Sequence, residues 1–390
     1  MRSGIYRGLE LGTCSLCRSR GLISSSVGVC YECLKNRVDE AVVISRSLRL
    51  KWRSSIGFPG EPPRDGRLKC SICINECLIP EGGRGFCGVW VNRGGKIEPI
   101  AGRGLMVAHT YLDPHPTNCV ATPVCPATGR GFPKYTFIRG IERGFYNLAV
   151  FLGGCPLDCI FCQNWEHKTM ISHGKLASWA KSYSIEDLVN EALDPLVTCV
   201  CYFGGDPTPH TPLLILASRT IIAESRRVGQ NFKRICWETD GLMNPNIMRE
   251  AARLSLESGG IVKIDWKAWT PSVYEALTGV NGEKAIRRLK ENTKLIASLA
   301  KDRVDPPLLV VSILLVPGYV TVEEVEKIAE YISSLEVNIP IVLLAFHPDH
   351  LMRDLPPTSR RHAREAERVV KSKGIKEVYI GNEWLLGNYY

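Results

Sequence analysis

From Tyr146 onward the sequence alternates between short strand-like and longer helix-like segments, and this alternation limits the fold more than any other feature. Apolar, β-rich runs predict strands at residues 147–152, 197–203, 234–237, 261–266, 308–316 and 341–346. Helices are predicted between them, at residues 185–193, 212–228, 245–256, 282–300 and 322–335. Such alternation builds right-handed βαβ units around a parallel sheet. It predicts an α/β fold of the partial (β/α)6 barrel type, whose active site lies at the carboxyl ends of the strands.

Sixteen cysteines are the second strong feature. Disulfides need an oxidising compartment, and the polar start of the chain has no apolar segment of a signal peptide. The longest apolar run, residues 308–316, is about half as long as a membrane-spanning helix. We therefore expect a cytoplasmic protein without membrane contact, whose closely spaced cysteines bind metal.

Two cysteine pairs open the chain: Cys14 and Cys17, then Cys30 and Cys33 after twelve intervening residues. This spacing is typical of a zinc ribbon or rubredoxin-like site, in which four thiolates surround one ion. Tetrahedral sulfur suits zinc or iron. We expect a metal-stabilised unit over residues 1–53, with a structural or docking role, because so short a unit needs the metal to fold.

A second set, Cys70, Cys73, Cys77 and Cys87, follows a Pro- and Gly-rich linker at residues 54–68. Its spacing is less regular, so a zinc site is our first expectation and an auxiliary iron–sulfur cluster that relays electrons is the second. We assign residues 69–134 to this cysteine-rich β segment and its loop, and residues 135–390 to the partial barrel.

The sharpest motif follows the first predicted strand, at the end where a barrel places its active site. There Cys155, Cys159 and Cys162 stand in a CxxxCxxC loop. Iron–sulfur clusters usually take four cysteines, so three at this spacing predict a 4Fe–4S cluster with one iron open to another ligand. A cluster with a distant fourth ligand and a set of structural thiols are the alternatives.

This loop resembles that of the radical S-adenosylmethionine (SAM) enzymes, and the resemblance continues at the later strand ends. In that family the open iron binds SAM, and reductive cleavage of SAM yields a 5′-deoxyadenosyl radical that abstracts hydrogen from a substrate. The resemblance assigns Phe161 to the adenine of SAM. It assigns Gly204, Gly205 and Asp206 to the SAM amino group, with Asp206 in the place of the family's glutamate.

Within the superfamily, the sequence is similar to the pyruvate formate-lyase activating enzyme branch. Residues 238–241, Glu-Thr-Asp-Gly, stand where that branch has Asp-Thr-Asn-Gly, which implies that Thr239 contributes to the SAM site. Asp265 and Lys267 match a pair that holds the carboxylate and ribose region of SAM. His347 matches a residue that packs on adenine.

Residues 69–382 resemble, with gaps, the radical SAM component of the AmmeMemoRadiSam system. The likeness rests on the segment from Lys69 to Val89 and on residues 161–166, 346–358 and 378–382. The N-terminal four-cysteine unit and the loop that contains Cys119 and Cys125 depart from that group. Trp90 also replaces an arginine. These departures argue against transferring a substrate from it.

Five cysteines fall outside the three sets. Cys199 and Cys201 alternate on one face of a predicted buried strand, and Cys236 lies within the next strand. Free cysteine packs as a small apolar residue, so we expect these three to belong to the core. The sequence does not decide whether Cys119 and Cys125 are a free pair, a disulfide or ligands that complete a metal site.

The resemblance implies an enzyme, a radical SAM oxidoreductase of the activating-enzyme type, with a low-potential electron donor such as ferredoxin or flavodoxin. We expect a protein substrate, with a metabolite as the next alternative. Residues 1–67 hold twelve basic and six acidic side chains, which favours an acidic partner such as RNA, although a solvated basic surface explains the same excess. A non-catalytic iron–sulfur electron carrier is the least favoured alternative.

Overall fold

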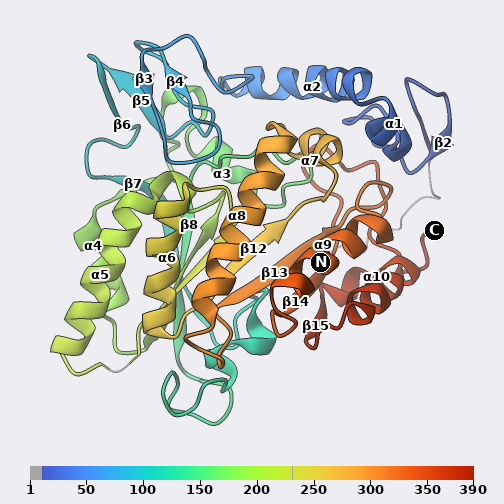
Figure 1. Cartoon of the computed structure of the whole chain (residues 1–390). Helices are drawn as coiled ribbons and strands as arrows, with labels where there is room; N and C mark the ends of the chain where they lie inside the picture. Colours follow the sequence, from blue (N-terminus) through green and yellow to red (C-terminus); the bar gives the residue numbers. More distant parts are fainter. Residues whose placement is uncertain (1–10, 231) are drawn as a thin grey trace.

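The computed structural model describes residues 11–230 and 232–390, and its centre is a nine-stranded sheet of these residues (Figure 1). The order is β15-β14-β13-β12-β11-β10-β8-β7-β9. Neighbours from β15 to β8 are parallel, whereas β7 and β9 join the far edge antiparallel. The strands are β7 (Met106–Pro114), β8 (Tyr146–Leu152), β9 (Lys181–Tyr183), β10 (Val197–Gly204), β11 (Arg234–Thr239), β12 (Val262–Trp266), β13 (Leu309–Leu315), β14 (Ile341–Ala345) and β15 (Val378–Gly381). The predicted α/β fold with a mostly parallel sheet is confirmed, and closure into a partial barrel stays a prediction.

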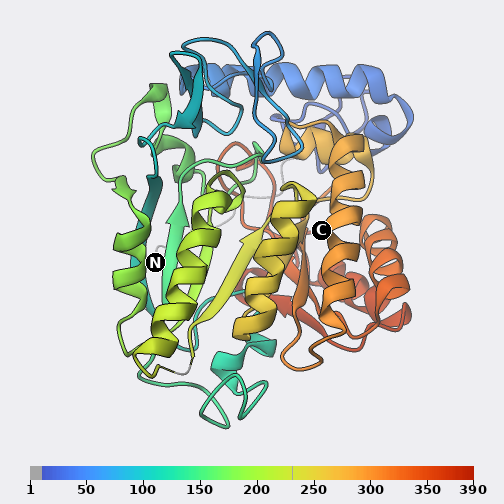
Figure 2. The same cartoon turned by 60° about the vertical axis from the view of Figure 1, so that its left-hand side comes forward.

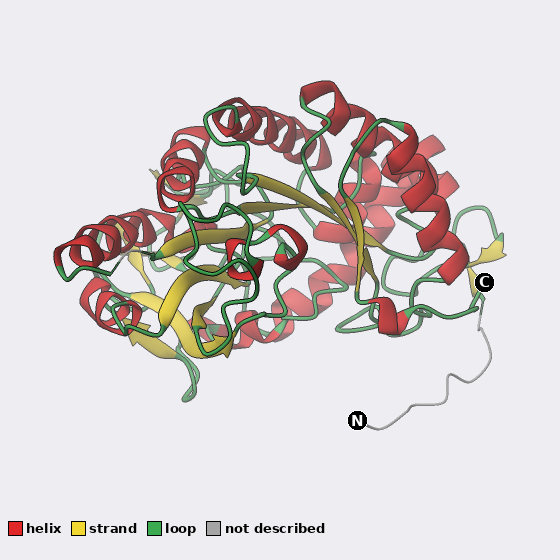
Figure 3. Cartoon of the chain, turned by 90° about the horizontal axis from the view of Figure 1, so that it is seen from below, coloured by secondary structure: helices red, strands yellow, loops and turns green. Residues whose placement is uncertain are grey.

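Helices connect the parallel strands and cover the outer face of the sheet (Figures 1 and 3). The main core lies between these helices and the sheet. The helices are α4 (Ile185–Ala192), α5 (Thr211–Arg227), α6 (Pro245–Ser258), α7 (Pro271–Thr278), α8 (Gly282–Ala300), α9 (Val322–Leu335) and α10 (Arg360–Ser372). None of the helices in the described part of the chain is both long and apolar enough to cross a membrane.

Local sequence explains where these helices begin and end. At α6, the Asn244 side chain accepts a hydrogen bond from the amide of Asn246, and Pro245 occupies the first turn. Gly259 ends the helix at φ 83°, a left-handed conformation that glycine adopts without strain. These residues fix the length of α6 and therefore the position at which β12 starts.

The inner face of the sheet is filled from below by the loop between β7 and β8, which we call the plug loop (residues 115–145; Figure 1). It contains the short 3-10 helices η1 (Thr122–Val124) and η2 (Pro126–Thr128). The buried carboxylate of Glu142 anchors it by accepting hydrogen bonds from Arg234 at 2.9 and 2.5 Å. The plug loop and the inward-facing residues of β10 and β11 form a second, smaller core.

Two N-terminal units lie across the upper end of the sheet, where the parallel strands end (Figures 1 and 2). The first contains β1 (Gly12–Thr13), β2 (Arg20–Gly21), α1 (Tyr31–Asn36) and α2 (Val38–Ser55). The second contains β3 (Leu68–Lys69), β4 (Leu78–Ile79) and the hairpin of β5 (Trp90–Arg93) and β6 (Lys96–Pro99). Residues 1–10 of the predicted N-terminal unit lie outside the described residues, and the predicted domain boundaries stay predictions.

Candidate active site

A cavity of about 220 Å³ opens at the carboxyl ends of the parallel strands. It lies where the loop after β8 meets the ends of β10, β11 and β12. The predicted site residues in its wall are Cys155, Cys159, Phe161, Cys162, Gly204, Gly205, Asp206, Thr239, Asp265 and Lys267. Residues distant in sequence are therefore gathered at one edge of the sheet, as the parallel strand order requires.

His347 is the predicted SAM contact that the structure places elsewhere. Its side chain is 45% exposed, and its Nδ1 lies 3.6 Å from Oδ2 of Asp349. The preceding Phe346 is fully buried. The loop after β14 thus points the histidine toward solvent and not into the cavity wall.

The cysteine loop after β8 is held by backbone hydrogen bonds to α7. The amides of Asp158 and Ile160 donate to carbonyls at the end of that helix, at 2.7 and 3.1 Å. Burial raises the pKa of Cys159 to about 12, and it also raises the pKa values of Cys155 and Cys162. The thiols therefore stay protonated until a bound metal displaces their protons.

The spacing of the three loop thiols suits a cluster better than a single ion. Among the residues that the structure describes, only the N-terminal cysteines bring three or more metal-binding atoms within 4.8 Å of one another. The thiols of Cys155, Cys159 and Cys162 are therefore more widely spread. In an iron–sulfur cubane each cysteine binds a different iron, so a wider spread is what such a cluster needs.

Asp158, between two of the loop cysteines, is buried among three cations. It is ion-paired with Lys168, and its carboxylate lies 3.4 Å from Arg53 and 3.6 Å from Arg49. Burial alone would raise the pKa of Asp158, but the charges of Lys168 and the two arginines lower it well below its usual range. Arg53 also stacks on Phe86 at 3.6 Å. Because both arginines belong to α2, the N-terminal helix is tied directly to the cysteine loop.

The carboxylate of Asp206 is occupied by neighbouring groups of the chain. It accepts hydrogen bonds from the amides of Thr208 at 2.8 Å and Asp240 at 2.6 Å, and from the Thr239 hydroxyl at 3.1 Å. The side chain is buried. Asp206 therefore holds the turn after β11 in position, and a contact with the SAM amino group would compete with these bonds.

Asp240 adds a second carboxyl group to the cavity wall, next to Asp206. Its Oδ2 lies 3.8 Å from Cys155 Sγ, and its Oδ1 accepts a hydrogen bond from the amide of Leu242 at 3.1 Å. Burial, and then the negative charge of Asp206, raise the pKa of Asp240 well above its usual value. Burial raises the pKa of Asp206 as well.

Two adjacent buried carboxyl groups with raised pKa values make a site that favours a cation. SAM carries an ammonium and a sulfonium group, so its charge suits this part of the cavity. The three loop thiols beside Asp240 are the ligand type that iron–sulfur clusters take. The residues present therefore fit both the cluster and SAM.

Four charged side chains form a ladder along β11 and β12 in the cavity wall. Lys263 Nζ lies 3.2 Å from Glu238 Oε2 and 2.9 Å from Asp265 Oδ1, and Lys267 Nζ lies 3.0 Å from Asp265 Oδ2. Ser312 of β13 also donates to Asp265. Burial alone would raise the pKa of Asp265, but Lys263 and Lys267 lower it well below its usual range. The ladder is thus a fixed set of charges that can orient a polar ligand.

The Gly204–Gly205 pair allows the end of β10 to approach the cysteine loop. Gly204 has φ 110°, and a Cβ at Gly205 would lie 2.1 Å from the carbonyl oxygen of Gly154 and 2.6 Å from Nδ1 of His167. Neither position tolerates a side chain without backbone movement. The pair is needed for this close approach whatever ligand it also contacts.

Several residues in the cavity wall were not predicted as site residues: Val120, Glu238, Asp240 and Lys263. Lys263 had a usable signal, because the two-residue repeat of a strand places it on the same face as Asp265. Val120 had none, since it reaches the cavity from the plug loop, far from the other residues in sequence.

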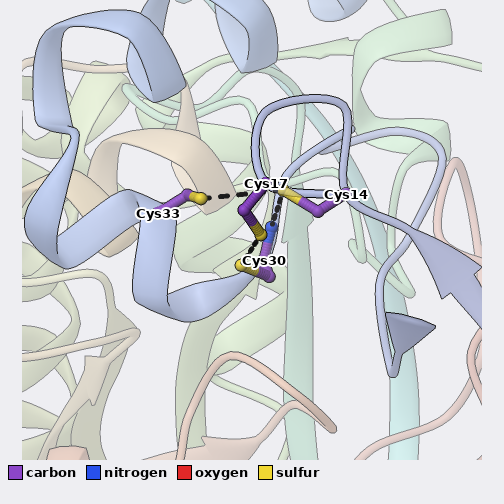
Figure 4. A group of neighbouring side chains, drawn as sticks. All are labelled: Cys14, Cys17, Cys30 and Cys33. Atoms are coloured by element: carbon purple, nitrogen blue, oxygen red, sulfur yellow. Dashed lines mark hydrogen bonds between the residues drawn. The ribbon is translucent and has the colours of Figure 1, made fainter. Parts of the chain in front are cut away.

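The four N-terminal cysteines form a compact thiol cluster (Figure 4). The Sγ atoms of Cys14 and Cys33 are 3.7 Å apart, and those of Cys17 and Cys30 are 3.6 Å apart. Metal–sulfur bonds of about 2.3 Å in a tetrahedron would separate the sulfur atoms by about 3.8 Å. Hydrogen bonds from Ser19 lower the pKa of Cys17 to about 6. The group can hold one metal ion, and tetrahedral sulfur suits zinc or iron.

This N-terminal unit docks on the loops and helices that follow the last strands. The Ser24 and Ser25 hydroxyls both donate to the Asp354 carboxylate at 2.8 Å. The Tyr31 hydroxyl donates to Glu324 at 3.0 Å, and the Tyr319 hydroxyl donates to the backbone of the unit at 3.0 Å. The unit is therefore part of the upper surface of the molecule and not a separate appendage.

The second cysteine set lies beside the cysteine loop. The Asn75 amide group donates to the Pro156 carbonyl at 2.8 Å, and the amide of Ile74 donates to the Leu242 carbonyl at 3.2 Å. Cys70, Cys73, Cys77 and Cys87 are not among the described thiols that gather within 4.8 Å. Zinc and an auxiliary cluster both stay predictions, and the wider spacing favours the cluster.

Comparison with known proteins finds one family model that matches part of the strand–helix region. The model of the radical SAM superfamily matches residues 149–332. An uncharacterized protein from Methanocaldococcus jannaschii is 23% identical over 320 residues, which is 82% of each chain.

Two solved structures are similar to parts of the chain. A domain of pyruvate-formate lyase-activating enzyme from Bacteroides vulgatus is 20% identical with a TM-score of 0.34, covering 47% of this chain and 98% of that one. Streptococcus suis SuiB bound to S-adenosylmethionine is 12% identical with a TM-score of 0.40, covering 58% of this chain and 47% of that one. The family match itself contains the cysteine loop and the strand ends around the cavity. The model of the radical SAM superfamily thus matches the part of the chain that forms most of the cavity wall.

Proposed function

We propose that the protein is a radical SAM enzyme that acts on a protein substrate, as an activating or modifying oxidoreductase. The observation that carries the proposal is the cavity in which the thiols of one loop face two buried carboxyl groups and an ion-paired lysine. Bound there, the cluster and SAM supply reductive cleavage of SAM and hydrogen abstraction from the substrate.

The residues of the chain bind and orient these groups. In the proposal, Cys155, Cys159 and Cys162 hold the 4Fe–4S cluster and leave one iron open. Asp240, beside Cys155, accepts a hydrogen bond from the SAM amino group. The Asp206 carboxylate keeps Asp240 in place by accepting a hydrogen bond from the backbone amide of Asp240.

The rest of SAM is assigned to the other strand ends. Asp265 and Lys267 orient its carboxylate and ribose region, while Phe161 and Thr239 complete the wall around it. His347, which lies outside the cavity wall, is left out of the proposal. Val120 and the apolar residues of the inner face close the cavity from below and exclude water.

A protein substrate is supported by the motifs shared with the activating-enzyme branch, and the similarity to the AmmeMemoRadiSam component is part of the same proposal. RNA is less favoured, because several basic residues near the N-terminus are already engaged. Arg49 and Arg53 are buried against Asp158, and Arg46 pairs with Glu61 and Glu275. These side chains are not free to bind phosphate groups.

The chemistry is tested by anaerobic reconstitution with iron and sulfide, followed by addition of SAM and dithionite. We expect 5′-deoxyadenosine from the wild-type chain and none from Cys159→Ala. Thermal unfolding of both chains without cluster shows whether the variant is folded. A wild-type chain that carries the cluster, binds SAM and still yields no product, with or without host extract, contradicts the proposal and favours an electron carrier.

The substrate class is tested by fractionating host extract and adding each fraction to the SAM cleavage assay. We expect stimulation by the retained macromolecular fraction, and we expect protease but not ribonuclease to remove it. Stimulation by the low-mass filtrate would instead favour a metabolite, and loss on ribonuclease treatment would favour RNA.

A further inference from the structure

Five cysteines from three separate segments line one small cavity inside the sheet. They are the residues outside the three spaced sets: Cys119 and Cys125 of the plug loop, Cys199 and Cys201 of β10, and Cys236 of β11. The cavity measures about 30 Å³, which is space for about two water molecules. Each segment has a separate explanation at the level of sequence, whereas the structure brings all five thiols to one cavity.

Ordinary core packing explains the other walls of this region but not its sulfur-rich side. Elsewhere the inner core consists of aliphatic residues such as Ile261, Val310 and Val342. Between β10 and β11 the strand register places Cys201 opposite Cys236. The plug loop then adds two more thiols to the same small space.

The two closest thiols have the separation of ligands on one metal. Cys199 Sγ and Cys236 Sγ are 3.5 Å apart, near the roughly 3.8 Å between two sulfur atoms on a tetrahedral ion. The described residues gather no third metal-binding atom within 4.8 Å of both, so a single-ion cage is not formed. Cys119, Cys125 and Cys201 remain to supply a second pair of ligands.

A second pair of ligands across a small cavity is the arrangement of a two-iron cluster. Iron–sulfur clusters of this type take four cysteines, two on each iron. Cys119, Cys125 and Cys201 line the same cavity as Cys199 and Cys236. Burial, and then the charge of Glu238, raise the pKa values of Cys119 and Cys201 well above the usual value. Burial raises the pKa of Cys125 to about 12, so these thiols stay neutral unless a metal replaces their protons.

A disulfide explains the five gathered thiols less completely than a cluster does. The Cys199 and Cys236 sulfur atoms are in contact but not bonded, and the two residues are staggered by two positions in the register of β10 and β11. Any single disulfide would also leave three buried thiols unexplained.

We propose that the interior cysteines bind a second iron–sulfur cluster, with Cys199 and Cys236 on one iron and two of Cys119, Cys125 and Cys201 on the other. The site is separate from the cysteine loop but adjacent to the SAM cavity, since Glu238 and Lys263 line both spaces. This inference is independent of the proposed substrate and of SAM cleavage.

The experiment uses the full chain with Cys155, Cys159 and Cys162 replaced by alanine, so that the loop cluster cannot form. This background chain is reconstituted anaerobically with ⁵⁷Fe and sulfide. Iron, acid-labile sulfide and zinc are measured per chain, and Mössbauer spectra are recorded. Adding Cys199→Ala and Cys236→Ala to the background is expected to remove about two irons and two sulfides per chain, the number in a two-iron cluster.

Val200→Ala in the same background is the matched control, because Val200 lies between the two β10 cysteines but packs in the outer core. It is expected to keep the full iron content. Should the double variant fail to fold, Cys119→Ser combined with Cys125→Ser on the plug loop replaces it, with the same expected loss, because any two ligands chosen from Cys119, Cys125 and Cys201 include at least one of these. Unchanged iron and sulfide in the cysteine variants, equal loss in Val200→Ala, or zinc in place of iron would overturn the proposal.

Discussion

For single residues, the chemistry of the cavity depends on which groups the carboxylate oxygens of Asp206 and Asp240 contact. Asp206 accepts hydrogen bonds from two backbone amides and a hydroxyl, so its short side chain reaches its neighbours and not the open space. Asp240, held by Asp206, extends toward Cys155. A glutamate at position 206 would carry its oxygen atoms one methylene further. The two aspartates therefore place one carboxylate against the turn after β11 and the other beside Cys155.

We expect Asp240→Asn to weaken SAM binding by roughly 10- to 100-fold, because it replaces a charge-assisted hydrogen bond of about 1.5–3 kcal/mol with a neutral one. Its unfolding temperature should stay near that of the wild type. Asp206→Asn should instead lower the free energy of unfolding by about 1–3 kcal/mol, since the amide group cannot accept all three hydrogen bonds. Equilibrium dialysis with SAM and thermal unfolding of both variants measure the two effects. The opposite pattern would assign the SAM contact to Asp206.

Among the structural elements, buried ion pairs hold together segments that are far apart in the sequence. Arg53 connects α2 to Asp158 of the cysteine loop and donates to the carbonyls of Pro59 and Phe86 at 2.6 and 2.7 Å. The Glu142–Arg234 pair fastens the plug loop to β11 in a similar way. Removal of one partner leaves the other charge buried without full compensation. This lowers the free energy of unfolding far more than removal of a surface ion pair does.

Arg53→Met is expected to lower the free energy of unfolding by about 3–5 kcal/mol, the range for breaking a buried ion pair. Arg46→Met, on the same helix, removes a pair whose arginine is half exposed and should cost no more than about 1 kcal/mol. Denaturant unfolding of the two chains without cluster gives the comparison. Equal losses would show that α2 is not anchored through Asp158.

Glu142→Gln tests the anchor of the plug loop through its pH dependence. Burial alone would raise the pKa of Glu142, but hydrogen bonds and charge from Arg234 lower it below its usual value. Because the folded pKa is depressed, the ionised pair stabilises the protein above the unfolded value of about 4.3 and this contribution is lost as the pH falls through the folded pKa. We expect a loss of about 3–5 kcal/mol at pH 7 that shrinks in acid. Urea unfolding at a series of pH values measures it, and a loss that is constant with pH would contradict this role.

At the scale of the whole molecule, two cysteine-rich units cover the upper end of the sheet (Figure 1). The N-terminal unit reaches Asp354, Glu324 and Tyr319, which follow or precede the last strands. The second cysteine unit contacts the cysteine loop and the turn after β11. Segments from both ends of the chain thus surround the cavity, and we expect their stability to depend on a metal ion held by the N-terminal cysteines.

Cys30→Ser is expected to remove one metal ion per chain and to make residues 11–36 sensitive to limited proteolysis, because a unit of this size needs its metal to fold. Cys87→Ser, in the second cysteine set, should leave that ion and the protection of residues 11–36 intact. Metal analysis after gel filtration and mass spectrometry of the fragments check both results. A Cys30→Ser chain with unchanged metal content would show that these four thiols do not bind the ion.

The repeating part of the fold was predictable because its signals are local. Each of the six predicted strands is present in the sheet, from β8 to β14, since apolar runs and intervening amphipathic segments mark them directly. The antiparallel edge strands β7 and β9 and the last strand β15 were not predicted as strands. Six of the nine residues of β7 are exposed or partly exposed, so its sequence lacks the apolar run that marks a buried strand.

The cavity was predictable to the extent that parallel strands end at one edge. That rule placed Thr239, Asp265 and Lys267 near the cysteine loop before their contacts were known. It does not reach His347, which lies in the loop after β14 and outside the cavity wall, and the contact of His347 with adenine stays a prediction. The rule that parallel strands end at one edge also does not distinguish Asp206 from Asp240. The two residues are of the same type and differ only in their hydrogen-bond partners.

Local sequence is enough to specify the strand–helix alternation, the three spaced cysteine sets and the strand ends at which the site forms. These features depend on residues close together in the chain, where spacing fixes geometry. Folding of the whole chain is needed to bring Cys119 and Cys125 to Cys199, Cys201 and Cys236, because the plug loop folds back into the sheet. The path of the chain between distant segments sets such contacts, and no local pattern records it.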